Sequence, residues 1–309
     1  MDSTAVFEAS RSRLASLAYR LLGSAADAQD AVQDAFLRWQ GAEVERIEVP
    51  EAWLTKVVTN LCLDRLRSAR ARHERAVGSW LPEPLLDGDP MLGPADTAEQ
   101  RESVSLAVLL LLERLSPNER AVYVLREAFS YSHAEIAQIL DITEASSQQH
   151  GHRAKRRVAD AHRGGEVDPE SARRIVEEFL AAAGSGRVER LVALLTDDAT
   201  AVSDRAGLSD AILEFSTPEK LAAIFRAGFK PTEAKRRIIG GSPQIHLAFV
   251  NGDPAMLAVF EGDVVGMVAF TVAGDKIAFA CGIGAPHRLG RLTAAWRERE
   301  PGEPLIASW

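Results

Sequence analysis

The segment Leu61–Arg75 carries five arginines and one histidine, whereas the whole chain of 309 residues has a formal net charge of −8. Guanidinium groups spaced along a helix can each neutralise a phosphate and release a counterion, so this segment suits a polyanion. Just upstream, apolar residues recur at spacings of three and four, at Trp53, Leu54, Val57, Val58 and Leu61. The pattern predicts one helix with a buried start and a basic end. A solvated helix end, where arginines only complement the helix dipole, is the alternative.

A second basic run, His150–Arg157, follows a pattern typical of a helix-turn-helix. Ser132–Leu140 has the periodicity of a short amphipathic helix, with apolar residues at Ala134, Ile136, Ala137 and Leu140. Thr143 is placed as the N-cap of a second helix over Ala145–Val158. Glutamine and arginine near the start of such a helix suit base edges in a major groove, and later basic residues suit phosphate. An ordinary helical hairpin with a basic surface is the alternative.

The order of these features resembles the extracytoplasmic-function sigma factors of bacteria. The region-two likeness lies in Ser24–Trp39 and Ala52–Arg67, and the region-four likeness in Leu115–Arg120, Tyr131–Ala137 and His152–Lys155. The resemblance covers roughly the first half of the chain, in the family's order. It implies two all-α DNA-binding domains, the second a helix-turn-helix, in a transcription initiation subunit that binds core RNA polymerase and promoter DNA.

The resemblance also implies roles for particular residues. An acidic helix face would dock on the polymerase, although a solvated face remains the alternative for each member: Asp27, Asp30, Gln33 and Asp34. The minus-10 element would be recognised and melted by Asn60, Asp64, Arg67 and Arg70. The minus-35 element would be read by Gln148, Gln149, His150 and Arg153.

Two positions depart from the family pattern. Family members carry an apolar residue at the position of Ser147 and often at that of Gly151. A glycine inside a helix costs about 1 kcal/mol relative to alanine. We therefore expect a less firmly held recognition helix, with minus-35 binding that is weak or depends on another domain.

The segment between the two domains is unlike a flexible spacer. Its prolines and glycines favour an extended connection, yet Trp80, Leu81, Leu85 and Leu86 are apolar. The motif Trp-Leu-Pro-Glu-Pro at this place is characteristic of a sigma subgroup with a fused C-terminal domain. We therefore predict an interdomain contact at Trp80, Leu81 and Leu85. A linker folded back on its own helices is the alternative.

The pattern changes after Asp168. Two helices, Ser171–Ala183 and Val188–Leu195, are followed by four strand-like runs, Gln244–Val250, Ala255–Glu261, Val264–Ala273 and Lys276–Ile283. Turn-forming residues separate the runs. Two leading helices and an antiparallel meander predict an α+β cone that resembles the SnoaL-like fold.

Enzymatic relatives of that fold use carboxylates or histidines in a pocket, and the candidates here are Asp197, Asp198, Asp204 and His246. They form no catalytic spacing. Asp197-Asp198 reads as a turn and His246 as a satisfied core histidine. In the sigma subgroup the domain is regulatory, and its two characteristic motifs are degraded here to Ser203–Gly207 and Ala285–Leu289.

Two functions compete at this point. The first is a sigma factor regulated by its fused domain, which is not an enzyme. The second is a SnoaL-like isomerase, cyclase or hydrolase tethered to a DNA-targeting module. A repressor that binds DNA alone fits the net acidity and the docking face poorly. The missing catalytic spacing favours the sigma factor, and whether an anti-sigma protein exists stays open.

Composition and segment lengths limit the other classes of protein to which the chain could belong. The two cysteines, Cys62 and Cys281, form no metal or disulfide pattern, and no cofactor is indicated. No signal peptide or membrane span is visible, so we expect a cytoplasmic protein that does not bind membranes. The expected domains are 1–76 (region two), 77–103 (linker), 104–163 (region four), 168–292 (SnoaL-like) and 293–309 (tail). The tail is apolar at its end, and we expect it to reach either the linker or the docking face.

Overall fold

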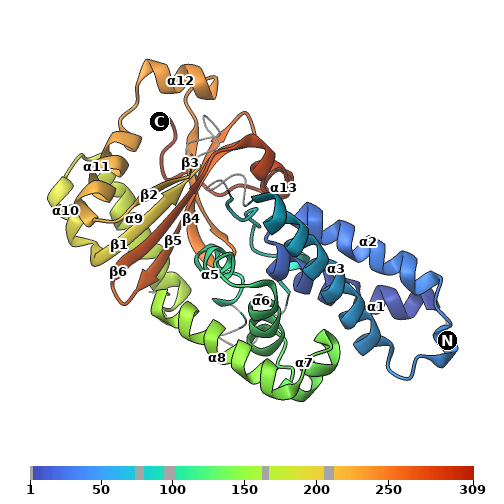
Figure 1. Ribbon diagram of the computed structural model, residues 1–309. Coiled ribbons are helices and arrows are strands. Elements are labelled where there is room, and N and C mark those ends of the chain that lie inside the picture. Colours follow the sequence, from blue (N-terminus) through green and yellow to red (C-terminus); the bar gives the residue numbers. More distant parts are fainter. Residues whose placement is uncertain (1–2, 74–79, 94–99, 101, 162–166, 205–211) are drawn as a thin grey trace. The chain divides into compact units, whose positions relative to one another are not determined.

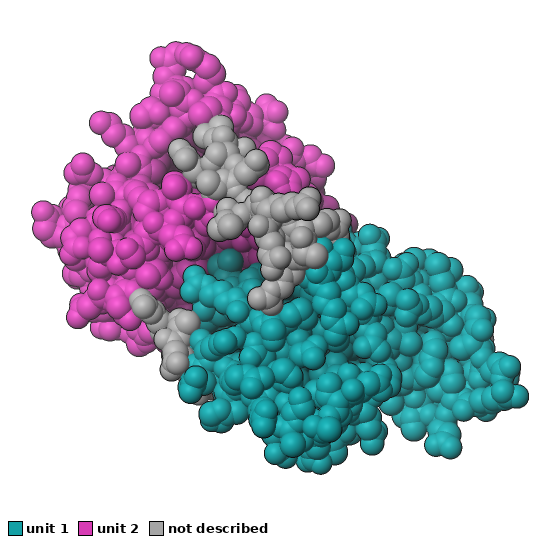
Figure 2. Space-filling model, in the orientation of Figure 1, with its two compact units in different colours: residues 1–77, 88–162 teal, residues 78–87, 163–309 magenta. Residues whose placement is uncertain are grey.

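The computed structural model describes residues 3–73, 80–93, 100, 102–161, 167–204 and 212–309. The chain divides into two compact units (Figure 2). Unit 1 comprises Met1–Val77 and Gly88–His162, and unit 2 comprises Gly78–Asp87 and Arg163–Trp309. The stretch that carries Trp80, Leu81 and Leu85 therefore belongs to the C-terminal unit.

Unit 1 begins with three helices (Figure 1), α1 (Ser3–Leu22), α2 (Ala25–Gln40) and α3 (Pro50–His73), and the short η1 (Val44–Arg46) precedes α3. The Ser24 hydroxyl caps α2 by accepting from the Asp27 N–H. Phe7, Tyr19, Trp39 and Leu54 are fully buried between the helices. The predicted helix with a buried start and a basic end is confirmed as α3, because Leu54 and Val58 are inaccessible whereas Arg67 is exposed.

The rest of unit 1 contains the predicted helix-turn-helix. The elements of this part of unit 1 are η2 (Pro90–Leu92), α5 (Leu106–Leu112), α6 (Pro117–Tyr123), the π-helix η3 (Val124–Ala128), α7 (His133–Leu140) and α8 (Glu144–Ala161). Helices α7 and α8 form the helix-turn-helix. Ser132 and Glu135 form a capping box that starts α7, and Asp141, with a positive φ of 53°, ends it. The apolar stripe of α7 differs from the expected one. Ile136 and Ile139 are buried, whereas Ala134 is exposed.

The two helical parts of unit 1 contact each other through polar side chains. Lys56 on α3 pairs with Asp141 at 2.6 Å, and the Thr55 and Tyr131 hydroxyls lie 3.2 Å apart. Arg13 on α1 donates to the Tyr131 hydroxyl at 2.9 Å. The buried Arg20 of α1 also donates to the Ser103 hydroxyl at 2.9 Å, so the two parts share buried as well as exposed polar contacts.

Unit 2 is an α+β domain around one six-stranded sheet. It begins with α9 (Pro169–Gly184) and α10 (Val188–Ala193), and α11 (Pro218–Phe229) and α12 (Glu233–Ile239) follow the strands β1 (Leu195–Ser203) and β2 (Leu213–Phe215). The remaining elements are β3 (Gln244–Val250), β4 (Asp253–Phe260), β5 (Asp263–Ala273), β6 (Lys276–Ile283) and α13 (Pro286–Arg297). The strand order is β2-β1-β6-β5-β4-β3. The predicted α+β fold with an antiparallel meander, β3 to β6, is confirmed.

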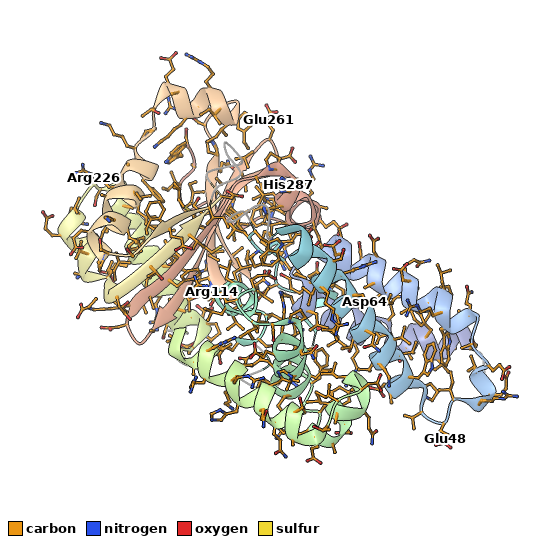
Figure 3. All side chains as sticks on the ribbon, in the orientation of Figure 1. Glu48, Asp64, Arg114, Arg226, Glu261 and His287 are labelled. Atoms are coloured by element: carbon orange, nitrogen blue, oxygen red, sulfur yellow. The ribbon has the colours of Figure 1, made fainter. Side chains whose placement is uncertain are left out.

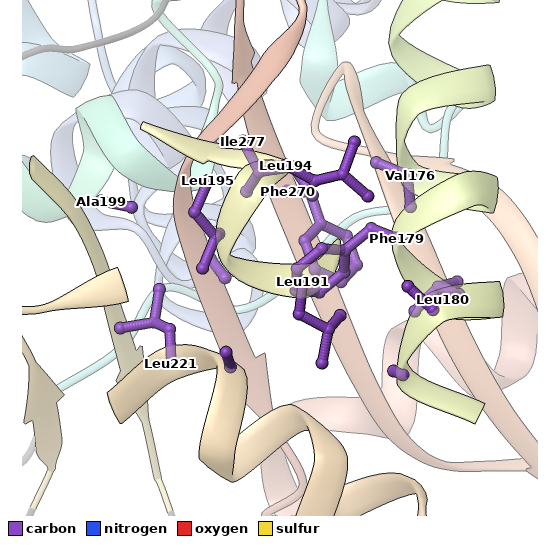
Figure 4. Close-up of a cluster of buried hydrophobic side chains, with 14 of the residues drawn as sticks. Val176, Phe179, Leu180, Leu191, Leu194, Leu195, Ala199, Leu221, Phe270 and Ile277 are labelled. Atoms are coloured by element: carbon purple, nitrogen blue, oxygen red, sulfur yellow. The ribbon is translucent and has the colours of Figure 1, made fainter. Parts of the chain in front are cut away.

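The hydrophobic core of unit 2 lies between the leading helices and the sheet (Figure 4). Phe179 of α9, Phe225 of α11 and Phe270 of β5 pack against one another in edge-to-face and tilted pairs, with ring centroids 4.9 to 5.8 Å apart. Leu191 and Leu195 are buried beside them. The helices are therefore held on the sheet by aromatic packing.

One prediction in this unit was wrong. Asp197 and Asp198 lie in β1, which pairs parallel to β6, and not in a turn. The register with β6 shifts between Leu195 and Thr200. This irregularity lets two consecutive carboxylates face solvent while Ala199 returns to the core. Two successive polar residues break the alternation by which a strand is found in a sequence.

The C-terminal segment also differs from what we expected. Helix α13 continues through position 292, where the SnoaL-like domain was expected to end, and Trp296 is buried. Beyond it, Ile306 forms a bridge with Ile245 of β3. The Trp309 indole donates to the Phe229 carbonyl at 3.1 Å. In unit 2 the tail therefore covers one end of the edge strand β3.

Candidate polymerase and promoter interface

The candidate docking face lies on α2. Asp27, Asp30 and Gln33 are exposed, and Asp34 is half-buried. Arg65 of α3 pairs with Asp34 at 2.8 Å and donates to the Asp27 carbonyl. Asp34 is thus tied to the neighbouring helix, whereas Asp30 and Gln33 point outward. The arrangement leaves an acidic surface whose charge would attract a basic partner.

The candidate minus-10 residues follow one another along α3. Asn60 is half-buried, and Asp64 (Figure 3) and Arg67 are exposed. The Arg67 guanidinium lies 3.3 Å from Asp64 and 3.4 Å from the side-chain oxygen of Asn118 on α6. Both contacts are long and solvent-exposed, so a phosphate can displace them at little cost. The side chain of Arg70 lies outside the described residues.

The candidate minus-35 residues lie on α8. Gln148 and Gln149 are exposed, and Gln148 donates to Glu144 at 3.3 Å. The His150 ring nitrogen lies 2.9 Å from an Arg153 guanidinium nitrogen. Burial, reinforced by the Arg153 charge, lowers the pKa of His150. A neutral imidazole at this place offers hydrogen bonds without adding charge.

Arg153 has a further partner that the motif analysis missed. The Glu119 carboxylate, 5% exposed, accepts from Arg153 at 3.0 Å and from Arg157 at 3.0 Å. It also accepts from the Ser116 N–H at 3.0 Å in the capping box of α6. Burial favours its neutral form, but these hydrogen bonds and the two guanidinium charges hold the pKa of Glu119 below its usual range.

Glu119 therefore connects the start of α6 to the middle of α8, and Arg153 helps to seat the recognition helix. The signal for this role was present in the sequence. Ser116 and Glu119 have the spacing of a capping box, which predicts a carboxylate fixed at a helix start. The pairing with α8 could not be predicted, because Arg153 is 34 residues away along the chain.

The linker forms backbone hydrogen bonds with β3 inside unit 2. Leu81 and Leu85 are buried and Trp80 is half-buried. The Leu85 N–H donates to the Asn251 side chain at 2.8 Å, and the Asn251 N–H donates to the Leu85 carbonyl at 2.9 Å. Leu86 forms a bridge with Val250. The linker thus lies along the end of β3 opposite to the one that the tail covers.

The described part of the first degraded motif, Ser203 and Asp204, is bonded to the segment that carries the second, and residues 205–207 lie outside the described residues. The Asp204 carboxylate accepts from the N–H groups of Gly284 at 2.9 Å and Ala285 at 3.0 Å. It thereby fixes the two residues that lead into α13. Arg288 in the first turn of α13 donates to the Leu81 carbonyl. One chain of hydrogen bonds therefore joins Asp204, the segment Gly284–Arg288 and the linker.

The remaining candidates for pocket chemistry are dispersed. Asp197 and Asp198 are exposed on β1. His246 is buried, its ring lies 5.1 Å from that of Trp296, and burial lowers its pKa. Burial also raises the pKa of the Cys62 thiol to about 12 and raises that of Cys281. These side chains converge on no common reacting centre.

Metal-binding clusters and membrane-spanning helices are absent from the described ranges. Among those residues, no group of three or more His, Cys, Asp and Glu side chains is placed to hold a metal ion. No helix there has both the length and the apolar character needed to cross a membrane.

Comparison with known families defines the class of unit 1. Residues 6–72 match the model of sigma-70 region 2, and residues 105–158 match that of sigma-70 region 4. Both lie within unit 1, in the order of the two helical parts described above. The chain therefore contains the two regions of a sigma-70-type transcription initiation factor.

Full-length relatives define the family. The chain is 40% identical to the ECF RNA polymerase sigma factor SigJ of Mycobacterium tuberculosis, over 97% of this chain and 93% of that protein. It is 30% identical to the probable ECF sigma factor SigI of the same species, over 89% and 90%. The crystal structure of SigJ covers 93% of this chain and 98% of its own, with a TM-score of 0.68 and 30% identity over the structural alignment. The chain belongs to the extracytoplasmic-function RNA polymerase sigma factors, as the sequence predicted.

Proposed function

We propose that this sigma factor docks on core RNA polymerase through the α2 face, reads the minus-10 element with α3 and the minus-35 element with α8, and is regulated by unit 2 through the linker. The observation that carries the proposal is that the linker preceding region four hydrogen-bonds to β3 of unit 2 through Asp87 and Phe249, and to the turn after β3 through Leu85 and Asn251. The matches to sigma-70 regions 2 and 4 support the assignments to α2, α3 and α8.

The docking role is supported by which acidic groups remain available. Asp30 and Gln33 are exposed, and Asp27 offers its side chain to solvent although its carbonyl is bound by Arg65. Long-range attraction between this face and a basic surface would speed association and orient it. We assign polymerase docking to Asp27, Asp30, Gln33 and Asp34 on these grounds.

The experiment for docking is charge reversal of Asp30 and Asp34 together. The double variant Asp30→Lys, Asp34→Lys should bind core polymerase at least tenfold more weakly in a pull-down titration, because two attractive charges become repulsive. Glu219→Lys on the exposed start of α11 is the matched control. Unchanged binding by a folded double variant would remove α2 from the interface.

The DNA assignments follow the same reasoning. Arg67 has only weak, exposed partners, so its guanidinium is available for phosphate or base contacts near the minus-10 element. Gln148 and Gln149 present amide groups from the first two turns of α8, where a recognition helix meets base edges. We assign two roles to Arg153. It holds α8 against α6 through Glu119, and it contacts DNA at the minus-35 element.

Regulation by unit 2 is supported by the burial of the linker. Leu81 and Leu85 are 1% and 0% exposed. Burying each leucine contributes roughly 1.5 to 3 kcal/mol before the cost of ordering the segment. Fixing the linker against β3 limits the separation that the two helical parts can reach, and promoter binding requires a defined separation. We assign the interdomain contact to Trp80, Leu81 and Leu85.

A regulatory rather than an enzymatic role for unit 2 is supported by the state of its polar groups. Asp204 is engaged by two N–H groups at the start of α13. His246 is buried against Trp296. An acid–base pair for isomerisation or hydrolysis needs groups within hydrogen-bond reach of one substrate. We therefore propose that unit 2 carries out no catalysis, and that the protein acts in the cytoplasm alongside the polymerase.

A further inference from the structure

The second half of α11 and the whole of α12 carry a basic surface to which the proposed function assigns no role. Residues 224–238 contain five Lys and Arg residues and one Glu, a net charge of +4 in a chain whose net charge is −8. Four of the five basic side chains are exposed: Arg226 (Figure 3), Lys230, Arg236 and Arg237. We call these four residues, together with Ile224 and Ile238, the α12 surface. Its charge suits an acidic partner.

The fifth basic residue, Lys235, fixes α12 against the end of α11. Its Nζ donates to three carbonyls there, those of Ala227, of Gly228 at 3.0 Å and of Lys230 at 2.9 Å. The C-terminal end of a helix favours a cation at this place. The centroid of the Trp309 ring lies 5.4 Å from the same Nζ. The α12 surface therefore stands on a fixed support, which reduces the conformational entropy that a partner must remove on binding.

Exposed apolar side chains lie among these charges. Ile224 is 41% exposed and Ile238 is 64% exposed. A phosphate backbone offers no apolar partner to an isoleucine, whereas a protein helix that carries both acidic and apolar residues offers partners to the arginines and the isoleucines alike. The composition of the α12 surface therefore favours a protein partner over a nucleic acid.

The α2 face of this same chain has the complementary composition. Asp30 and Gln33 are exposed. Leu37 follows Gln33 by four positions and Asp30 by seven, so it lies on the same side of the helix, and it is 58% exposed. The α2 face thus places a carboxylate beside an exposed leucine, as the α12 surface places guanidinium groups beside Ile238.

We propose that the α12 surface of one molecule binds the α2 face of a second copy of this chain. Arg236 and Arg237 meet the carboxylates of α2, and Ile238 packs near Leu37. Two such contacts related by a two-fold axis close a dimer. The dimer covers the α2 face, so self-association and polymerase binding exclude each other. The contact itself needs only the two surfaces, whereas this competition rests on the docking role proposed for α2.

The test uses charge reversal on each surface of the full chain, with self-association measured by sedimentation velocity over a concentration series. The α2 variant is Asp30→Lys, Gln33→Lys, which leaves the Asp34–Arg65 pair in place. The α12 variant is Arg236→Glu, Arg237→Glu. Each variant alone should associate at least tenfold more weakly than wild type, because like charges then face each other. An equimolar mixture of the two should associate again, because each reversed surface meets its opposite on the other chain.

The matched control is Arg173→Glu, Arg174→Glu on α9. These arginines are also adjacent and exposed, and Arg173 pairs with Glu177 at 3.0 Å as Arg237 pairs with Glu233 at 3.0 Å. The control should associate as wild type does. A wild-type chain that stays monomeric, or a mixture that associates no better than its components, would overturn the proposal. Loss of duplex-DNA binding by the α12 variant, with unchanged self-association, would assign the surface to nucleic acid and overturn it too.

A pull-down of core polymerase with the same variants separates this contact from the docking role of α2. If the α2 variant loses self-association but binds polymerase as wild type does, polymerase docking fails and the contact between copies stands. If it loses polymerase binding but still self-associates, the contact between copies fails and docking stands. Where both hold, the α12 variant should bind more polymerase than wild type at sigma-factor concentrations at which wild type is dimeric.

Discussion

The two basic helices of unit 1, α3 and α8, carry similar charge but hold it differently. On α3, Arg67 meets exposed Asp64 and Asn118 at 3.3 and 3.4 Å. On α8, Arg153 and Arg157 share the buried Glu119 carboxylate, each at 3.0 Å. An exposed pair contributes little to folding, whereas removing a buried partner leaves polar groups unsatisfied. Arg67 of α3 is thus free of strong partners, whereas Arg153 and Arg157 of α8 also stabilise the fold.

The largest effect that follows from this contrast is on stability. Glu119→Ala removes a capping-box carboxylate and the common partner of two arginines, so it should lower the free energy of unfolding by about 2 kcal/mol. Asp64→Ala, the matched change on α3, should cost less than about 0.5 kcal/mol. Urea unfolding, followed on the transition of unit 1, measures both. Equal losses for the two variants would break the contrast between the helices.

A pH series sharpens the same contrast. The folded pKa of Glu119 is held below its ordinary value of 4.5, so its contribution is fully present above that value and is lost as pH falls through the folded pKa. Between about pH 5 and pH 3, wild type should therefore lose more unfolding free energy than Glu119→Gln, whose side chain does not titrate. Parallel stability curves for the two proteins would show that the Glu119 carboxylate gains nothing from Ser116, Arg153 and Arg157.

A smaller effect separates the helices at the promoter. Arg67→Ala should lower the salt slope of open-complex formation by about one, because a phosphate contact is lost without harm to the fold. Arg153→Ala should act mainly through stability and a looser α8. The salt slope and the unfolding midpoint are measured for both variants. We expect the salt slope to change mainly in Arg67→Ala and the unfolding midpoint mainly in Arg153→Ala. A slope change for Arg153 and none for Arg67 would reverse the assignment.

Much of the fold could be predicted because local patterns determine it. The helix-turn-helix follows from the capping signal at Thr143 and from the spacing of apolar residues. The β3–β6 meander follows from turn residues such as Asn251-Gly252. Strand β1 was missed because its exposed Asp197 and Asp198 lie at a register shift. No local pattern identifies such a strand until its partner β6 is in place.

The site residues also divide into those that local motifs predict and those whose partners depend on tertiary packing. Candidate contacts on α2, α3 and α8 could be named from motifs, because each lies on a regular helix face. The pairing of Glu119 with Arg153 and of His133 with Ser147 joins different helices, so it depends on tertiary packing. The hydrogen bonds between Leu85 and Asn251 span 166 positions of sequence. The linker motif predicted that the C-terminal domain covers these leucines, but the strand that does so, β3, could not be named from the sequence.

Transcription in vitro from a library of genomic promoters, with purified core polymerase, tests the central claim most directly. The full chain is compared with a chain that ends at Arg163 and so lacks the sheet against which Leu85 is buried. The account predicts initiation from one shared set of minus-35 and minus-10 sequences by both chains, with a transcript yield that differs by tenfold or more. Initiation without promoter preference, or equal yields from the two chains, would contradict it.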